Sequence, residues 1–323
     1  MRHTPASKSG KSGNVSLDLS RLQRLAEGML SLTLMVGAAG CGPTAGPEAE
    51  PESLGVLRAA EEVENGLSTN GLSTNGLSTN GLSTNGLSTN GFSTWFNQNP
   101  SNAAAVMTYV VKCAVPAGQT RAFTDPLTGT THTWQGGLGL APGWASGQVA
   151  TELEQQVVSA CLAAHANKYG INIPISVLGR TAQGTAIDYT PSELSTFSER
   201  EACFFGNLFD GSGIFAGNDQ DYLTSQESTS RACGLSSSAS TSDCPPIVHV
   251  SQCSTLCERA YVGTDAKPYY AECTYNGKTY RPLTTRIRPQ DIYSCGDGTC
   301  QFTERCGTGT AYNSCQADCG TCP

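Results

Sequence analysis

The sequence has little of what marks membrane-spanning and nucleic-acid-binding proteins. Its apolar run at 29–36 is too short to cross a bilayer. Its 19 basic residues are outnumbered by 27 acidic ones, and they form no stripe of Lys and Arg along the chain. A phosphate backbone requires such a positive footprint, so the composition excludes nucleic acid as a partner.

The common catalytic motifs are also missing. There is no G-x-S-x-G nucleophile turn, because Ser146 is displaced by one position in its segment, and there is no H-E-x-x-H motif. Beyond residue 40 the chain has three histidines, His132, His165 and His249. Cys161 and His165 have the spacing of neighbours on one helix face, but a cysteine in a disulfide offers no thiolate for catalysis. We therefore expect both to be packing residues.

Acidic residues in the central region leave one hydrolytic mechanism open. A glycosidase needs only two carboxylates at a suitable separation, which a sequence does not reveal, and isolated surface acids are more common. The segment 219–221, with Asn218 and Asp210 nearby, is also rich in the oxygen ligands that calcium uses, without the twelve-residue calcium loop. The carboxylate candidates are Glu199, Glu201, Asp210, Asp219 and Asp221.

What the chain does have, at its start, is the build of an export signal. Basic residues precede the apolar run at 29–36, and the small residues Ala38-Ala39-Gly40 precede Cys41. This junction resembles the lipobox of bacterial lipoproteins. The resemblance implies that residues 1–40 are a signal peptide and that Cys41 is lipidated. The protein would then be held at a membrane of the bacterial cell envelope, at the outer membrane or cell surface. An ordinary secretory signal is the alternative.

The cysteine count agrees with export. The chain has 15 cysteines, and assigning Cys41 to the lipid leaves an even number, as expected in an oxidising compartment. Eight of these lie at 113–273 and six at 295–322, so each set can close its own disulfides, although the connectivity stays open. Zinc is the alternative, but no second pair stands at finger spacing. The cysteines expected in disulfides are Cys113, Cys161, Cys203, Cys233, Cys244, Cys253, Cys257, Cys273, Cys295, Cys300, Cys306, Cys315, Cys319 and Cys322.

Residues 41–91, which we call the stalk, are predicted to be disordered. The stretch at 42–64 is rich in Pro, Ala and Glu and has too little apolar content for a core. Six five-residue copies follow from Asn65, five reading NGLST and the sixth, at 90–94, NGFST. They resemble pentapeptide repeats that wind into β-helices, but six copies make too few coils to bury their leucines. We therefore expect loose turns, since Asn-Gly favours positive φ.

The folded body is predicted at 92–293, which is long enough for one hydrophobic core. We expect a helix at 103–111 capped by Ser101 or Asn102, a hairpin of 121–123 with 132–134, and a helix at 150–169. A strand at 171–177 should lie at a sheet edge, because Pro174 cannot donate to a ladder. A capping box should start a helix at Thr190, and a strand at 247–250 and a hairpin at 274–280 should follow. Helices early and strands late indicate an α+β domain with an antiparallel sheet.

The last segment, 294–323, is predicted to be a small disulfide knot. Six cysteines within 29 residues must hold together a module too short for a core. Asp297, Glu304 and Asp318 are calcium candidates, with turn-forming aspartates as the favoured interpretation and no cofactor expected. The pattern C-G-D-G-x-C…E-x-C…D-C-G-x-C resembles cysteine-rich modules at the ends of exported myxobacterial proteins. Segments 112–118, 139–144, 159–162 and 205–209 resemble a family of myxobacterial lipoproteins, which brings no activity with it.

These features together predict a non-enzymatic binding or structural lipoprotein of the cell envelope. The anchor, the repeat array and the lack of a catalytic constellation support this hypothesis. The alternative is an envelope hydrolase acting on glycan or peptide. Two carboxylates converging in a cleft would favour the hydrolase. The ligand is not readable from the sequence.

Overall fold

The structure is a computed structural model, and the residues it describes belong to the second of two compact units, Glu52–Pro323. The predicted signal peptide, Cys41, Cys233, Cys244, Asp221 and Asp297 therefore lie outside the described residues. The described residues are 60–61, 67–68, 90–167, 172–220, 246–292, 295–296, 298, 300–301 and 303–323.

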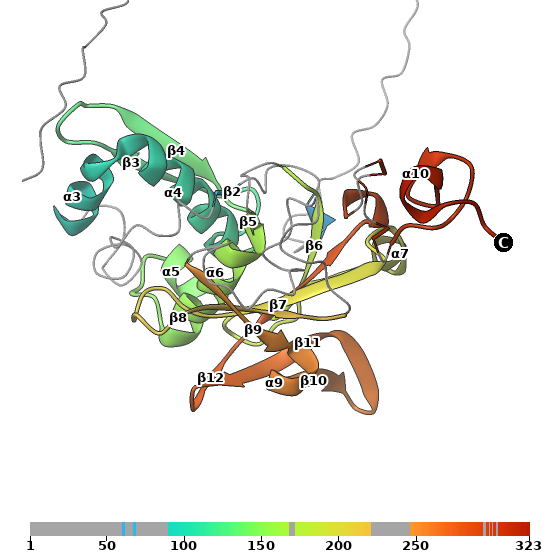
Figure 1. Ribbon diagram of the computed structural model, residues 1–323. Coiled ribbons are helices and arrows are strands. Elements are labelled where there is room, and N and C mark those ends of the chain that lie inside the picture. The colour runs from blue at the N-terminus through green and yellow to red at the C-terminus, as the bar shows by residue number, and fades with distance from the viewer. Residues whose placement is uncertain are drawn as a thin grey trace, which may run out of the picture. The chain divides into compact units, whose positions relative to one another are not determined.

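A six-stranded sheet forms the centre of this unit (Figure 1). Neighbouring strands pair antiparallel, except that β8 and β9 run parallel. In spatial order the strands are β1 (Ala60–Glu61), β6 (Ile175–Gly179), β13 (Leu283–Ile287), β7 (Glu199–Asn207), β8 (Gly213–Asn218) and β9 (Ile247–Gln252).

The central sheet is covered on both faces. Successive side chains of a strand point to opposite faces. On β7, Phe204 belongs to the main core together with Leu162, whereas its neighbour Phe205 belongs to a second cluster with Tyr270 and Tyr280. The first face is covered by helix α6 (Glu152–His165). The second is covered by a three-stranded sheet of β10 (Cys257–Val262), β11 (Asp265–Tyr275) and β12 (Lys278–Tyr280).

The helices precede most of the strands, as predicted. Helix α6 starts at a capping box, in which the Thr151 side chain accepts from the backbone N–H of Glu154 and the Glu154 side chain accepts from that of Thr151. Helix α4 (Pro100–Ala114) is capped by Asn99, so the predicted cap at Ser101 or Asn102 is wrong by two or three residues. The remaining helices are α3 (Asn90–Gln98), α5 (Pro142–Ala145), α7 (Pro191–Thr196), α9 (Cys253–Leu256), α10 (Gln316–Cys319) and the 3-10 turn η1 (Pro289–Asp291).

Both predicted hairpins form. Strands β3 (Thr120–Thr124) and β4 (Thr131–Gln135) pair antiparallel, with Phe123 and Trp134 buried against α3 and α4. Strands β11 and β12 turn at Asn276 and Gly277, which both have positive φ, 51° and 74°. That is the backbone of the two-residue turn that Asn-Gly favours.

Three local predictions are wrong. The strand predicted at 171–177 starts only after Pro174 and lies between β1 and β13, because a proline ahead of the ladder removes no bond from it. The helix predicted at 150–169 ends at His165, and Ala166–Asn167 form a short strand. At Thr190 the side chain caps α7, but the Glu193 carboxylate accepts from the Ser176 hydroxyl, at 2.7 Å.

Parts of the predicted stalk are paired with the folded unit. Residues Ala60–Glu61 pair with β6, and strand β2 (Leu67–Ser68) pairs parallel with β5 (Ala166–Asn167). The sixth repeat copy starts α3 and buries Phe92 completely. The predicted disorder is therefore wrong at Ala60–Glu61, and the predicted loose turns are wrong at Leu67–Ser68 and at Asn90, where α3 begins. The rest of the stalk lies outside the described residues.

The C-terminal segment is braced by its own disulfides, which join Cys295 to Cys315, Cys300 to Cys319 and Cys306 to Cys322. Among the described residues of this segment, regular structure is limited to β14 (Thr310–Ala311), β15 (Ser314–Cys315) and α10. The predicted fold class is confirmed: a disulfide-braced α+β domain with an antiparallel sheet is followed by a small disulfide-bonded segment. No helix within the described residues is long and apolar enough to cross a membrane.

Candidate functional site

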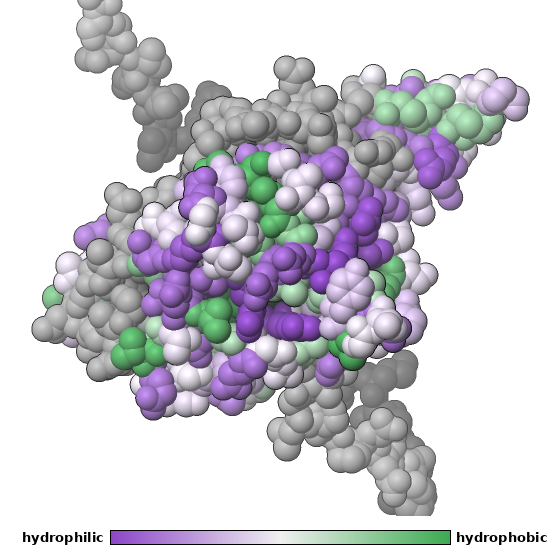
Figure 2. Space-filling model, turned by 90° about the horizontal axis from the view of Figure 1, so that it is seen from below, coloured by the Kyte–Doolittle hydropathy of each residue, from purple (hydrophilic) through white to green (hydrophobic). Residues whose placement is uncertain are grey.

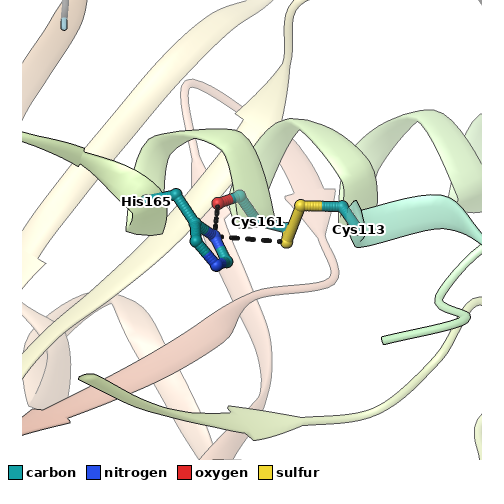
Figure 3. A group of neighbouring side chains, drawn as sticks. All are labelled: Cys113, Cys161 and His165. Atoms are coloured by element: carbon teal, nitrogen blue, oxygen red, sulfur yellow. Dashed lines mark hydrogen bonds between the residues drawn. A yellow bond between two sulfur atoms is a disulfide. The ribbon is translucent and has the colours of Figure 1, made fainter. Parts of the chain in front are cut away.

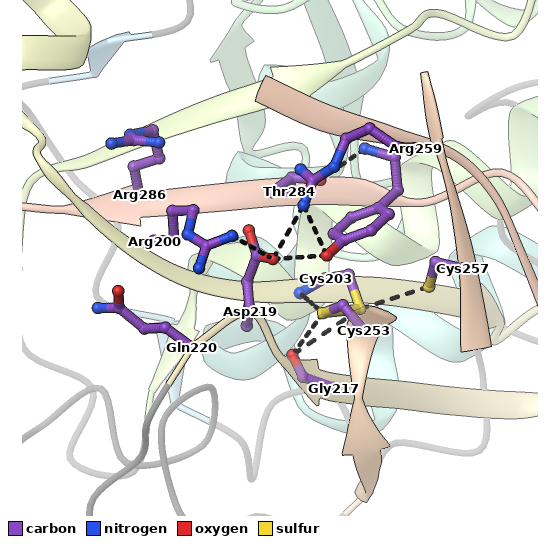
Figure 4. Close-up of polar contacts among 12 residues, drawn as sticks. Arg200, Cys203, Gly217, Asp219, Gln220, Cys253, Cys257, Arg259, Thr284 and Arg286 are labelled. Atoms are coloured by element: carbon purple, nitrogen blue, oxygen red, sulfur yellow. Dashed lines mark hydrogen bonds and ion pairs between the residues drawn. A yellow bond between two sulfur atoms is a disulfide. The ribbon is translucent and has the colours of Figure 1, made fainter. Parts of the chain in front are cut away.

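A polar cavity of about 420 Å³ opens where β7, β8, β9, β10 and β11 meet (Figure 4). Asp219, directly after β8, lines the cavity, and two arginines lie beside its carboxylate. The lining residues are Arg200, Asn218, Asp219, Gln220, Gln252, Ser254, Arg259 and Tyr270.

Irregular strand pairing places three of these side chains. The register between β13 and β7 shifts by one residue at Glu201, beside Arg200. Because Ala202 and Phe204 face α6, a regular strand would point Arg200 to that face as well; the extra residue lets it line the cavity on the side of Tyr270. Similar shifts lie near Gln252 in β9 and at Arg259 in β10. Bulges of this kind recur beside functional sites, where they re-aim side chains.

Backbone strain marks the same place. Ser251, in the bulged end of β9, has a φ of 143°, which side-chain-bearing residues rarely adopt. It immediately precedes Gln252 of the cavity wall. Such strain costs of order 1–3 kcal/mol and persists where the surrounding structure imposes it, often at binding sites.

The Asp219 carboxylate connects the groups of the cavity. Its side chain is only 1% exposed, and its Oδ1 accepts a hydrogen bond of 2.6 Å from the Tyr270 hydroxyl. The same oxygen lies 3.4 Å from Nη2 of Arg259 and 3.6 Å from Nη1 of Arg200. Its Oδ2 is buried and has no hydrogen-bond partner among the described residues. One carboxylate is therefore shared by two cations and a phenol.

Arg259 and Tyr270 form a cross-strand pair. They are register partners between β10 and β11, and the guanidinium carbon lies 3.9 Å from the centre of the tyrosine ring. Nη2 of Arg259 also donates to the tyrosine oxygen, at 2.8 Å. Burial, and then the hydrogen bond to Asp219, raises the pKa of Tyr270 well above its usual range. The phenol therefore stays protonated and keeps donating to the carboxylate.

A third arginine lies close by but is turned to other acceptors. Arg286 is the register partner of Arg200, and its guanidinium donates to the backbone oxygens of Phe197 and Ser198. Figure 4 shows it pointing away from Asp219. Burial lowers its pKa. Two arginines directly opposite each other repel, and the nearby carboxylate of Asp219 offsets that repulsion.

Two touching disulfides hold the elements that carry this cavity. Cys203–Cys253 joins β7 to α9, and Cys257–Cys273 joins β10 to β11. The Sγ atoms of Cys203 and Cys257 lie 3.6 Å apart. Each of the four cysteines is within three residues of a cavity residue, Arg200, Gln252, Arg259 or Tyr270. This proximity is the one signal in the sequence that could have located the site.

Of the central acids within the described residues, Asp219 alone lines the cavity. Asp210 pairs with Lys278 at 2.6 Å, and Glu199 accepts from the Gln220 amide at 3.1 Å. Glu201 is fully buried, and Asp221 lies outside the described residues. The calcium interpretation of 219–221 does not fit Asp219, because the guanidinium groups of Arg259 and Arg200 lie 3.4 and 3.6 Å from its Oδ1 and would repel a cation.

The other predicted sites take structural roles. Cys161 is bonded to Cys113 on α4, and Nδ1 of His165 lies 2.8 Å from the backbone oxygen of Cys161, all fully buried (Figure 3). The packing interpretation is confirmed, because a disulfide sulfur is no nucleophile. Trp134, like Trp95 and Trp144, is at most 6% exposed and belongs to the core.

In the C-terminal segment the candidate calcium ligands accept from backbone groups. Asp318 receives the N–H groups of Gly296 and Gly298, at 2.5 and 3.0 Å, and Glu304 receives that of Gln301, at 2.9 Å. Asp297 lies outside the described residues. These are the bonds of turn-forming carboxylates.

Comparison with known proteins identifies only the repeat array. A family model of the GLTT repeat matches residues 63–94 in six copies. Neither the curated proteins nor the solved structures contain a match to the chain. The match supports the repeats that the sequence predicts and leaves the folded domain to be interpreted from its own geometry.

Proposed function

We propose that this protein is a lipid-anchored lipoprotein of the bacterial cell envelope whose domain binds a ligand and catalyses no reaction. The proposal includes the resemblance to exported myxobacterial lipoproteins, with Cys41 as the lipid attachment and the outer membrane or cell surface as the location. The domain would be presented outside the membrane on the segment that carries the repeats.

The observation that carries the proposal is the state of the cysteines. All twelve described cysteines form six disulfides. Disulfides at this density persist in oxidising compartments, which a bacterial protein reaches by export. Cys41 stands apart from these cysteines, directly after small residues and an apolar run, as an attachment cysteine would.

The cavity supports a binding role more than a hydrolytic one. Its one carboxylate, Asp219, already shares two arginines and a tyrosine hydroxyl. A glycoside hydrolase needs a proton donor and a second carboxylate on opposite sides of a sugar bond. The face seen in Figure 2 is mostly hydrophilic, and its apolar areas are small and separate. A polar ligand in the cavity suits this surface better than an apolar partner does.

The test is substitution of the attachment cysteine. Cys41→Ser should abolish labelling by a radioactive fatty acid and move the protein out of the membrane fraction, because one sulfur carries the lipid. Thr44→Ser, three residues further on, is the matched control and should keep both label and location. Lipid on the Cys41→Ser protein would refute the anchor. Protection of the wild-type domain from protease added to intact cells would refute surface display.

A further inference from the structure

The charges around the cavity leave one positive charge without a counterpart. Among the residues that line the cavity, Arg200 and Arg259 contribute two cations and Asp219 contributes one anion. This excess lies in a chain whose formal net charge is −8. The local field of a cavity with excess positive charge attracts anions even where the chain as a whole is negative.

Both guanidinium groups have N–H groups to offer. Arg200 contacts Asp219 through Nη1 alone, and its side chain is 45% exposed. Arg259 uses Nη2 for both Asp219 and Tyr270. The remaining N–H groups of the two guanidinium ions have no acceptor among the described residues. Arginine presents such groups as a planar fork that matches the two oxygens of a carboxylate.

We propose that this cavity binds the carboxylate group of a small polar molecule, with Arg200 and Arg259 as the anion ligands. The inference rests on the proposed binding function and names its ligand class. A monoanion neutralises the single excess charge. A phosphate dianion would leave a negative charge beside the buried Asp219, which repels it. Asp219 thus sets the preference for a carboxylate.

The rest of the wall fits the neutral part of such a ligand. The side chains of Gln252 and Ser254 have no hydrogen-bond partner among the described residues, and both residues are exposed. An amide and a hydroxyl can each donate and accept, so they suit hydroxyl or amide groups on the ligand. The cavity volume of about 420 Å³ is in the range of small-molecule sites. The ligand is therefore a carboxylate on a hydroxylated or amide-bearing frame.

The experiment is calorimetric titration of the mature protein without reductant. The probes are glucuronate and N-acetylglycine, which carry a carboxylate on a sugar and on an amide frame, with glucose and inorganic phosphate as comparisons. We expect at least one of the two carboxylates to bind. The one that binds more tightly shows whether the natural ligand carries its carboxylate on a sugar or on an amide frame. Phosphate should bind more weakly, and glucose should give no heat.

Variants connect the binding to the two arginines. Arg200→Gln should lower the affinity for the carboxylate about tenfold or more, because a charge-assisted hydrogen bond contributes on that scale. The affinity of Arg200→Lys should lie between those of the wild type and Arg200→Gln, since lysine keeps the positive charge but lacks the planar pair of N–H donors. Arg180→Gln, which removes an arginine stacked on Tyr269 outside the cavity, is the matched control and should bind as wild type. An unchanged melting temperature for Arg200→Gln shows that folding is intact.

Three results would overturn the inference. They are tighter binding of phosphate than of either carboxylate, equal loss in Arg200→Gln and Arg180→Gln, and no saturation by either carboxylate at about 10 mM. Each would leave the lipid attachment of Cys41 standing, because that is measured by labelling. Failure of the ligand class and failure of the proposed anchor are therefore distinguishable.

Discussion

Replacing Asp219 by Asn would remove a buried negative charge from the cavity at almost no change in volume. The Asp219 side chain is 1% exposed, whereas that of its partner Arg259 is 24% exposed. Asn keeps one oxygen to accept from the Tyr270 hydroxyl, so the substitution isolates the charge from the shape. It leaves Arg259 stacked on Tyr270 with no anion beside it.

The expected cost follows from two contributions. A hydrogen bond to a charged acceptor contributes about 1.5–3 kcal/mol and a neutral one about 1 kcal/mol, so the bond from Tyr270 loses about 0.5–2 kcal/mol. Breaking a fully buried ion pair costs about 3–5 kcal/mol, and the partial exposure of Arg259 reduces this, since water can solvate its guanidinium. We expect Asp219→Asn to lower the free energy of unfolding by about 2–4 kcal/mol.

Asp210→Asn is the matched control. Asp210 also forms an ion pair, with Lys278 at 2.6 Å, but its side chain is 31% exposed and Lys278 keeps a second partner, Glu152, at 2.9 Å. An exposed pair of this kind contributes at most about 1 kcal/mol. The two variants make the same chemical change at a buried and at a partly exposed carboxylate.

Urea unfolding at neutral pH without reductant measures both costs, and equal slopes validate the comparison. A loss for Asp219→Asn no larger than for Asp210→Asn would refute the expectation that the buried ion pair contributes more than the exposed one. An independent readout is the tyrosine titration, with Tyr270→Phe to assign the signal. The pKa of Tyr270 should fall when Asp219 loses its charge, yet stay above the usual range because burial is the larger cause.

Two further predictions concern the core and the pH dependence. Replacing both Cys113 and Cys161 by Ala should cost about 4 kcal/mol from the entropy of a loop of 48 residues, and a loss below about 1 kcal/mol in urea unfolding would contradict that assignment. Burial lowers the pKa of His249, so below pH ~6.5 the unfolded chain binds a proton that the folded one does not, and stability should fall as the pH falls. His249→Gln should show a shallower fall between neutral and mildly acidic pH, and an unchanged slope would contradict the burial.

Local signals predicted the elements that local interactions decide. Thr151 and Glu154 are three residues apart and form the cap that starts α6, and Asn276-Gly277 is a turn wherever its strands lie. The prediction that β6 lies at the sheet edge is wrong, because the neighbours of a strand are decided by long-range interactions. A proline excludes only the ladder positions that it occupies, and whether β1 pairs beside the strand depends on residues far away in the sequence.

The cavity could not be predicted in this way, because no two of its charged groups are close in sequence. Arg200, Asp219 and Arg259 come from β7, the end of β8 and β10, and a register shift turns Arg200 to the right face. Because β7 is buried on both faces from residue 201 onward, its sequence has no polar–apolar alternation in which a bulge could be recognised. The sequence suggests Asp219 as one of two carboxylates of a glycosidase pair, whereas its partners in the structure are the arginines Arg200 and Arg259.

The disulfides explain what further information would have been needed. Cys203, Cys253, Cys257 and Cys273 each lie within three residues of a cavity residue, so their pairing alone brings β7, α9, β10 and β11 together. Eight cysteines allow 105 pairings, and the sequence does not choose among them. The two bridges bring the segments that carry Arg200 and Arg259 together, and the register shift beside Arg200 then turns its side chain to the cavity. In this chain the connectivity of the cysteines, more than any motif, carries the position of the site.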